Sequence, residues 1–249
     1  QRVWVFRAGS ARPRCGTAAA FCVLEDPQAV PLPDGVSMAE GAALGVPCLT
    51  AHSALFMDGA LPAAAVVLVH AGAGAVGEAA IRFAARAGAR VIATASTPEK
   101  QAIARAAGAA EVLDYRDPGC AAAILALTGG KGVHRIIEVD FAANQALAAA
   151  VIRPHGVIAS YSSTHNPKPV LDYYPFAMKA VTLHFVQGML LHGAVRDAAV
   201  AATRQGLEQG WLRPRLGLVV PLARIAEAQA AVEAGTGGKA IVTLPDAPD

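Results

Sequence analysis

Short apolar runs alternate with alanine-rich segments through the middle of the chain. Runs that are rich in Val, Ile and Leu and bounded by Gly, Pro or polar residues predict strands. The predicted strands are Val66–His70, Arg90–Ala95, Glu111–Leu113, Arg135–Val139, Val157–Tyr161 and Val181–Val186. The predicted helices between them are Glu78–Ala87, the segment from Pro98 to Gly108, 119–127 and 143–151. Strands such as Val66–Val69 lack polar alternation, so we expect an α/β fold with a doubly wound parallel sheet covered on both faces.

The two ends of the chain follow a different pattern. Val3–Phe6 and Ala18–Leu24 are strand-like, and several prolines interrupt the sequence that follows. Ser37 and Glu40 form a capping-box pattern that opens a short helix. The stretch 164–175 is predicted to be irregular, and a helix (Asp197–Gln209) and a closing strand (Ala240–Leu244) are predicted after the six-strand unit. The sequence opens inside a predicted strand without an initiator Met, so we interpret it as a fragment.

Composition excludes several classes of protein. Hydrophobic residues make up 54% of the 249 positions and charged residues 16%, which is typical of a folded chain. A net charge of +2 with scattered Lys and Arg gives no reason to expect nucleic acid, and no stretch approaches the roughly 20 apolar residues of a membrane span. Cys15, Cys22, Cys48 and Cys120 form no CxxC pair, which favours free thiols in a reducing cytoplasm.

A glycine motif joins the first strand of the alternating region to its first helix. Gly72-Ala73-Gly74-Ala75-Val76-Gly77 follows Val66–His70 at once. In this context the first glycine permits a tight turn, the second lets the backbone approach a pyrophosphate, and the third lets helix pack on strand. A turn that serves packing alone is the alternative. We interpret the motif as a pyrophosphate cradle.

The end of the second strand distinguishes between the two common dinucleotides. NAD sites usually place an acid there to bind the ribose 2′-hydroxyl. The sequence here is Ile92-Ala93-Thr94-Ala95-Ser96-Thr97, with Lys100 following and Arg116 after the third strand. A solvated helix position is the alternative for Lys100. Hydroxyls and cations in place of an acid predict NADPH.

The spacing of Tyr, Lys, His and Asp residues along the sequence identifies no catalytic residue. Tyr174 and Lys179 are five apart with Pro175 between them, which excludes the Tyr and Lys four apart of short-chain dehydrogenases. His52, His134 and His184 lie in apolar surroundings, where packing or a backbone hydrogen bond is favoured over catalysis. Asp140 follows the fourth strand and either caps the next helix, which we prefer slightly, or faces a pocket at the strand's carboxyl end.

Several segments together resemble the medium-chain dehydrogenase/reductase superfamily, and within it the zinc-independent quinone oxidoreductases related to zeta-crystallin. The segments are Gly41–Ala51, Val69–Gly77, Val112–Arg116, Gly210–Pro214, Pro221-Leu222, Ala226–Gln229 and Gly238–Ala240. The resemblance implies a Rossmann domain (47–187) inserted into a partial GroES-like, β-rich catalytic domain (1–46 and 188–249). It also implies that the family's N-terminal portion, with a substrate-side tyrosine, is not in this sequence.

The resemblance assigns cofactor contacts by position. Thr50 would lie near the nicotinamide ribose, and Gly72, Ala73, Gly74, Ala75, Val76 and Gly77 would hold the pyrophosphate. Ser96, Lys100 and Tyr115 would surround the adenosine 2′-phosphate. Tyr161, Ser162, Phe185 and Gln187 would line the nicotinamide side.

The same resemblance implies the chemistry. Zinc-dependent relatives carry a cysteine four residues before the threonine that matches Thr50, and Val46 stands here, so no metal is expected. The reaction implied is direct hydride transfer from NADPH to a quinone or other electron-poor enone. An enoyl-thioester reductase is a close variant, and a non-catalytic NADPH-binding or structural protein is a different class. The family commonly forms homodimers through the edge strand that corresponds to Val181–Val186.

Overall fold

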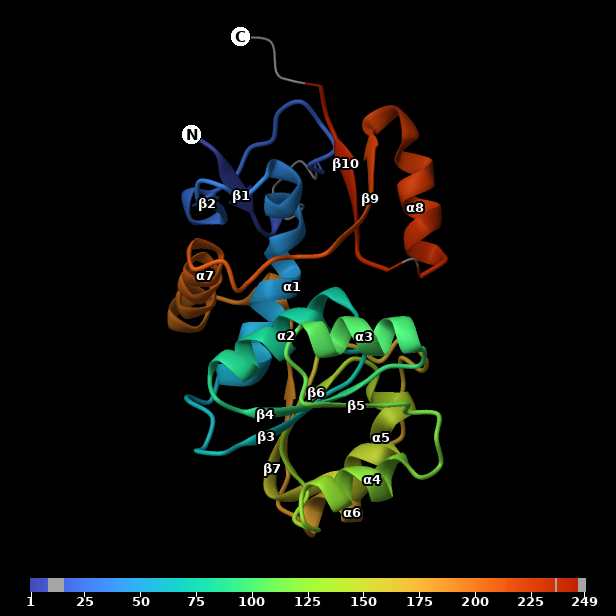
Figure 1. Cartoon of the computed structure of the whole chain (residues 1–249). Coiled ribbons are helices and arrows are strands. Elements are labelled where there is room, and N and C mark those ends of the chain that lie inside the picture. The colour runs from blue at the N-terminus through green and yellow to red at the C-terminus, as the bar shows by residue number, and fades with distance from the viewer. Residues whose placement is uncertain (9–15, 236, 246–249) are drawn as a thin grey trace. The chain divides into compact units, whose positions relative to one another are not determined.

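The computed structural model describes residues 1–8, 16–235 and 237–245. Contacts divide the chain into two compact units (Figure 1). One unit comprises Gln1–Leu49 and Gly188–Asp249, and the other comprises Thr50–Gln187. The long helix α1 (Met38–Phe56) begins in the first unit and ends in the second.

The Thr50–Gln187 unit is built on a six-stranded parallel sheet. Its strands are β3 (Val66–Val69), β4 (Arg90–Thr94), β5 (Glu111–Leu113), β6 (Val133–Glu138), β7 (Ile152–Ser160) and β8 (Thr182–Phe185). Their spatial order is β5-β4-β3-β6-β7-β8, and every neighbouring pair is parallel. Two halves that run outward from a central pair define the doubly wound Rossmann fold, so the predicted α/β class is confirmed.

Helices cover both faces of this sheet. They are α2 (Ala75–Arg86), α3 (Pro98–Ala106), α4 (Cys120–Leu127), α5 (Phe141–Val151) and α6 (Tyr173–Ala177). Figure 1 shows α2 and α3 on one face and α4, α5 and α6 on the other. All six predicted strands and all four predicted helices are present, although β7 begins five residues before the predicted start and α2 three residues before it.

Local sequence signals explain where α3 begins and ends. The side chain of Thr97 accepts a hydrogen bond from the Lys100 N–H at 3.3 Å, and Pro98 occupies the first turn. This arrangement satisfies one of the N–H groups that a helix start leaves unpaired and fixes φ where the helix needs it. Gly108, at φ +113°, takes the left-handed conformation that stops the helix.

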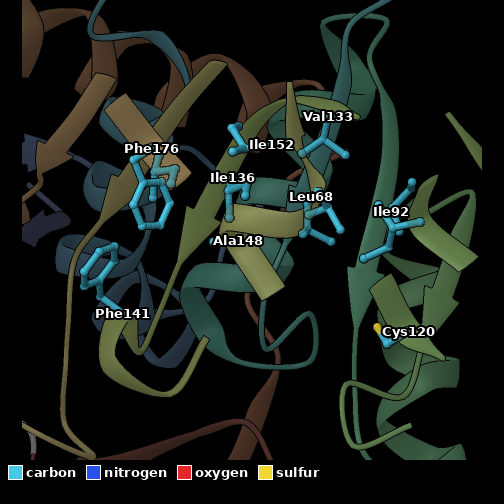
Figure 2. Close-up of a cluster of buried hydrophobic side chains, with 12 residues drawn as sticks. Leu68, Ile92, Cys120, Val133, Ile136, Phe141, Ala148, Ile152 and Phe176 are labelled. Carbon is cyan, nitrogen blue, oxygen red and sulfur yellow. The ribbon is translucent and has the colours of Figure 1, made fainter. Parts of the chain in front are cut away.

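The core of this unit lies between the sheet and the helices α4, α5 and α6 (Figure 2). Leu68, Ile92, Ile136 and Ile158 come from four adjacent strands and are at most 1% exposed. Helix side chains close the cluster from one side, and they include Cys120, Ile124, Phe141, Ala148, Val151 and Phe176. Each fully buried Leu or Ile contributes about 1.5–3 kcal/mol, so this face fixes the sheet that carries the site.

The other unit contains two small sheets. Strands β1 (Val3–Val5) and β2 (Ala29–Pro31) pair antiparallel, and β9 (Leu216–Pro221) and β10 (Lys239–Thr243) pair parallel. Its helices are α7 (Gly193–Glu208) and α8 (Ile225–Glu233), with 3₁₀ turns at Asp26–Gln28, Gly188–Leu190 and Leu222–Arg224. Trp4 is 2% exposed.

Several predictions for the less regular parts of the chain are wrong. Residues 18–24 form bends and coil instead of a strand, and β1 pairs with β2 instead. Phe21 and Val23 in that segment are exposed, and none of the strands that the structure describes pairs with it. Helix α6 lies partly in the stretch predicted to be irregular, and β9 and α8 carry no pattern strong enough to have been predicted.

Helix α1 is longer than predicted. The capping box is present, since the Ser37 N–H donates to Glu40 Oε2 at 2.8 Å and the Glu40 N–H donates to Ser37 Oγ at 3.2 Å. The helix nevertheless runs for 19 residues and continues through Pro47. Leu44 and Leu49 on either side of this proline are fully buried. Their packing outweighs the hydrogen bond that a proline removes from a helix.

The structure also bears on the thiols and on the possibility of a membrane span. Cys22, Cys48 and Cys120 are free thiols, and Cys15 lies outside the described residues. Within the described ranges, no helix is both long enough and apolar enough to cross a membrane.

Candidate functional site

The glycine motif forms the loop between β3 and α2, at the carboxyl edge of the sheet. A Cβ on Gly77 would lie 2.2 Å from the Ala71 carbonyl oxygen, and a Cβ on Gly72 would lie 2.9 Å from the Ala93 Cβ and 3.0 Å from the Ala104 Cβ. Both positions therefore require glycine. Gly74 is the N-cap of the 12-residue helix α2. A helix of this length directs its first N–H groups and a partial positive charge toward whatever lies before it, which suits a phosphate.

The positive φ in this turn lies at the residue before the first glycine. Ala71 has φ +51°, whereas Gly72 is absent from the positive-φ residues that the structure describes. The role predicted for Gly72, to permit a tight turn, therefore does not involve a positive φ. Gly72 is needed because β4 and α3 approach this loop so closely that no side chain fits.

A cavity of about 280 Å³ opens beside this loop. Its lining residues come from the carboxyl ends of β3, β4, β5 and β6, from the start of α5 and from the loop after β7. They are His70, Ala71, Thr94, Tyr115, Val139, Asp140, Ala143, Asn144 and Thr164. Of the residues predicted for the site, Tyr115 lines this cavity. The position agrees with the rule that ligands of open α/β sheets bind beyond the carboxyl ends of the strands.

A buried polar cluster that the sequence analysis did not identify lies beside the cavity, and two of its three members, His70 and Thr94, line it. His70, Thr94 and Glu138 are at most 1% exposed. His70 Nδ1 lies 3.0 Å from Thr94 Oγ1, and His70 Nε2 lies 3.6 Å from Glu138 Oε2. Burial lowers the pKa of His70, and the nearby Glu138 carboxylate opposes that shift. The 3.6 Å separation is too long for a hydrogen bond, so neither of these two atoms has a hydrogen-bond partner within the described part of the chain.

Glu138 also determines how Asp140 is held. Its Oε1 accepts hydrogen bonds from the Asp140 N–H at 2.6 Å and from Asn144 Nδ2 at 2.8 Å. Burial and the Glu138 charge raise the pKa of Tyr161 above its usual range. The Asp140 side chain forms no cap bond to α5, so the preferred capping interpretation is wrong. Asp140 faces the cavity instead.

Cationic residues lie near the end of β4, where an acid would favour a free ribose hydroxyl. The Arg116 guanidinium donates to the Ser96 carbonyl and binds Asp114 with Nε at 3.0 Å from Oδ1 and Nη2 at 2.6 Å from Oδ2. These hydrogen bonds from Arg116 lower the pKa of Asp114 to about 2. Lys100 is exposed in the first turn of α3. Arg116 shares its charge with Asp114, whereas Lys100 extends from the helix into solvent.

The residues predicted for the nicotinamide side lie outside this cavity. Thr50 is buried within α1. Tyr161 and Ser162 directly follow β7, Phe185 ends β8, and Gln187 comes two residues later. Phe185 and Gln187 are exposed. Their predicted roles remain predictions.

Two of the histidines have the structural roles that were expected. His52 packs against Phe56 and Phe83, with ring centroids 4.9 and 5.4 Å away, and burial lowers its pKa to about 4. His134 Nδ1 accepts a hydrogen bond from the Val66 N–H at 3.0 Å. Both histidines therefore contribute to packing or to backbone bonding.

His184 belongs to an ionic network on the sheet. Its Nε2 lies 2.9 Å from Asp58 Oδ1, so its surroundings are more polar than the sequence indicated. Asp58 Oδ2 also accepts a hydrogen bond from Arg135 Nη2 at 2.7 Å, and Arg135 Nη1 donates to the Ala54 carbonyl at 2.7 Å. Arg135 is 6% exposed. This network ties the end of α1 to β6 and β8.

Among the residues that the structure places, no group of three or more His, Cys, Asp or Glu side chains is arranged to hold a metal ion.

A Rossmann sheet with a glycine loop before α2 and a cavity at the carboxyl edge defines a nucleotide-binding type of α/β protein. The sequence model described as zinc-binding dehydrogenase matches residues 75–202. Human quinone oxidoreductase is 30% identical over 234 residues, which cover 92% of this chain and 70% of the human protein. The chain belongs to this zinc-binding dehydrogenase family, in the quinone oxidoreductase-like group of the medium-chain dehydrogenase/reductase superfamily.

Solved structures share the fold. An NAD-dependent alcohol dehydrogenase superposes with a TM-score of 0.85 at 28% identity, covering 93% of this chain and 66% of that one. A mycobacterial protein complexed with NADPH superposes with a TM-score of 0.82 at 28% identity, covering 91% of this chain and 71% of that one. This chain thus spans about two thirds of their length. The two neighbours are named with different nicotinamide cofactors, so the choice between NAD and NADPH depends on the residues of this chain.

Proposed function

We propose that this chain belongs to an NADPH-dependent oxidoreductase that transfers a hydride to a quinone or another electron-poor enone without zinc. The observation that carries the proposal is the combined geometry of the carboxyl edge. A loop with room only for glycine at Gly72 and Gly77 precedes α2, and the end of β4 carries Ser96 and Lys100 instead of an acid. Human quinone oxidoreductase as a relative and the NADPH complex of a structural neighbour support the same conclusion.

The residues of the chain would mainly bind and orient the cofactor. The loop Gly72–Gly77 and the first N–H groups of α2 would hold the pyrophosphate. Lys100 and Ser96 would receive a 2′-phosphate, with Arg116 fixed against the Ser96 carbonyl by its pair with Asp114. NADPH, when bound, supplies the hydride. Catalysis would then come from orientation and from exclusion of water, since no proton donor is assigned on this chain.

The cofactor assignment predicts a selective effect of Lys100. Replacing Lys100 with Ala should weaken NADPH about five- to tenfold, because one charge-assisted contact to the 2′-phosphate is lost. NADH lacks this phosphate, so its dissociation constant should not change. Calorimetric titration of both cofactors measures the effect, and Lys131→Ala, at an exposed lysine outside the site, is the matched control. An equal loss for NADH would refute the role of Lys100.

Three candidate activities differ in turnover. Steady-state NADPH oxidation by the full-length protein, with quinones and with 2-enoyl thioesters as acceptors, separates a quinone reductase from an enoyl-thioester reductase. Tight NADPH binding with no turnover of either would favour a non-catalytic NADPH-binding protein. Activity that a chelator abolishes and zinc restores would contradict the zinc-independent assignment, which depends on Val46 at the cysteine position of zinc-dependent relatives.

The assembly is also proposed. β8 is an edge strand of the six-stranded sheet, and Phe185 on it is 77% exposed. We infer a cytoplasmic homodimer in which two β8 strands pair to form a continuous sheet. Light scattering that gives the mass of one chain at micromolar concentration would contradict it.

A further inference from the structure

Asp140 carries an unsatisfied acceptor at the cavity. Its Oδ2 accepts a hydrogen bond from the His165 N–H at 2.9 Å. Its Oδ1 is buried and has no hydrogen-bond partner among the residues that the structure describes. Since Asp140 lines the cavity, a molecule bound there or an ordered water can provide a donor for Oδ1.

The surroundings hold this carboxylate in place. Glu138 Oε1 accepts from the Asp140 N–H and from Asn144 Nδ2, which fixes both the backbone of Asp140 and the amide of its neighbour. Glu138 is fully buried. The backbone bond to Glu138 and the bond from the His165 N–H to Oδ2 thus order the Asp140 carboxylate before a donor binds.

The remaining walls of the cavity fit a flat, aromatic group. Tyr115 provides a ring, and Ala71, Val139 and Ala143 provide apolar surface. The pyrophosphate loop lies at β3, and the proposed 2′-phosphate contacts lie at the end of β4. The adenine ring, attached to the same ribose, is the part of NADPH that suits a cavity lined from the ends of β3, β4, β5 and β6.

We propose that Asp140 Oδ1 accepts a hydrogen bond from the exocyclic amino group of the cofactor's adenine, which makes Asp140 a determinant of base specificity. This assignment rests on the proposed binding of NADPH. The amino group is the donor that distinguishes adenine from hypoxanthine, which carries a carbonyl acceptor at the corresponding position. A carboxylate oxygen attracts the first base and repels the second.

The wild-type protein alone tests this assignment. Calorimetric titration compares NADPH with deamino-NADPH, in which hypoxanthine replaces adenine. We expect deamino-NADPH to bind about 10- to 100-fold more weakly, because a hydrogen bond to a charged group is replaced by two facing acceptors. Equal affinities would overturn the role of Asp140 and leave NADPH binding intact. Binding of neither cofactor would overturn the proposed function as well.

A variant sharpens the test. Asp140→Asn presents an amide that can rotate to donate or accept, so the preference for NADPH should shrink to a few-fold. Asp172→Asn, the same chemical change at an exposed position of the same unit, should keep the wild-type preference. An equal weakening of both cofactors by Asp140→Asn would show that Asp140 contacts the ribose or acts only structurally, and would overturn the proposal.

Discussion

Two buried polar side chains on strand β6 differ in how completely they are hydrogen-bonded. Arg135, near its start, has the Ala54 carbonyl and the Asp58 carboxylate as partners at 2.7 Å each. Glu138, at its end, uses Oε1 for two hydrogen bonds while Oε2 has none among the described residues. Both side chains are almost completely buried.

The difference separates structural polarity from polarity directed at a ligand. A buried group that only stabilises the fold is normally fully hydrogen-bonded, because an unpaired one costs about 1–3 kcal/mol. The unpaired atoms of His70 and Asp140 belong to side chains that line one cavity, where a bound molecule or water would provide partners, and the unpaired Glu138 Oε2 lies 3.6 Å from His70 Nε2. Incomplete hydrogen bonding supports a binding site where the side chains concerned line a cavity, as His70 and Asp140 do, and not by itself, since the unpaired His52 Nδ1 is packed away from the cavity.

The largest effect should follow from breaking the satisfied network. Replacing Arg135 with Met removes both bonds and leaves the Ala54 carbonyl and Asp58 without their buried donor. We expect the free energy of unfolding to fall by about 2–4 kcal/mol. Urea denaturation measures it. Arg204→Met removes an exposed i,i+4 pair with Glu208 and should cost less than about 0.5 kcal/mol. Similar losses in the two variants would contradict the structural role of Arg135.

A smaller effect tests an unpaired polar group that is packed away from the cavity. Burial lowers the pKa of His52 to about 4, so the unfolded chain takes up a proton near pH 6.5 and the folded chain does not. Stability is therefore fully present above pH 6.5 and falls as the pH drops toward 4.

Replacing His52 with Phe keeps the ring contacts with Phe56 and Phe83 and removes this titration. Allowing for partial exposure, the variant should gain about 1 kcal/mol relative to wild type between pH 7.5 and pH 5. Urea denaturation across this range measures the slope. Parallel pH profiles for the two proteins would show that another group controls the acid limb.

The smallest effect on stability should come from Glu138, in the buried polar cluster beside the cavity. Glu138→Gln keeps an oxygen for Asp140 and Asn144 and removes a buried charge whose other oxygen has no partner. The free energy of unfolding should change by less than about 1 kcal/mol in either direction, because removing an unpaired buried charge offsets the weaker hydrogen bonds of the amide. A loss as large as that of Arg135→Met would show that Glu138 stabilises the fold as much as Arg135 does, and would contradict the comparison.

The fold was predictable where one signal acts locally. Runs such as Val66–Val69 identify buried parallel strands, and Thr97 with Pro98 marks a helix start. The false strand at residues 18–24 and the unpredicted β9 show the limit. Whether a short apolar segment becomes a strand depends on whether another strand is available to pair with it, which a single sequence does not state.

The sequence predicts the glycine motif of the site but not its cluster of buried polar side chains. The glycine loop and the missing acid after β4 are readable within 30 residues. His70 and Glu138 are 68 positions apart and meet because β3 and β6 are neighbours in the sheet. Each ends or directly follows its strand, so applying the Rossmann strand order to the predicted strands would have placed them side by side.

The close contact of Gly72 with Ala93 and Ala104 divides the many alanines of this chain into two kinds. Ala104 is fully buried against the glycine loop, whereas Ala102, two residues earlier on α3, is exposed. A saturation-mutagenesis survey should find Ala102 tolerant of most residues and Ala104 tolerant of almost none. Alanine abundance here therefore records a helix-forming preference at some positions and a strict limit on side-chain size at others.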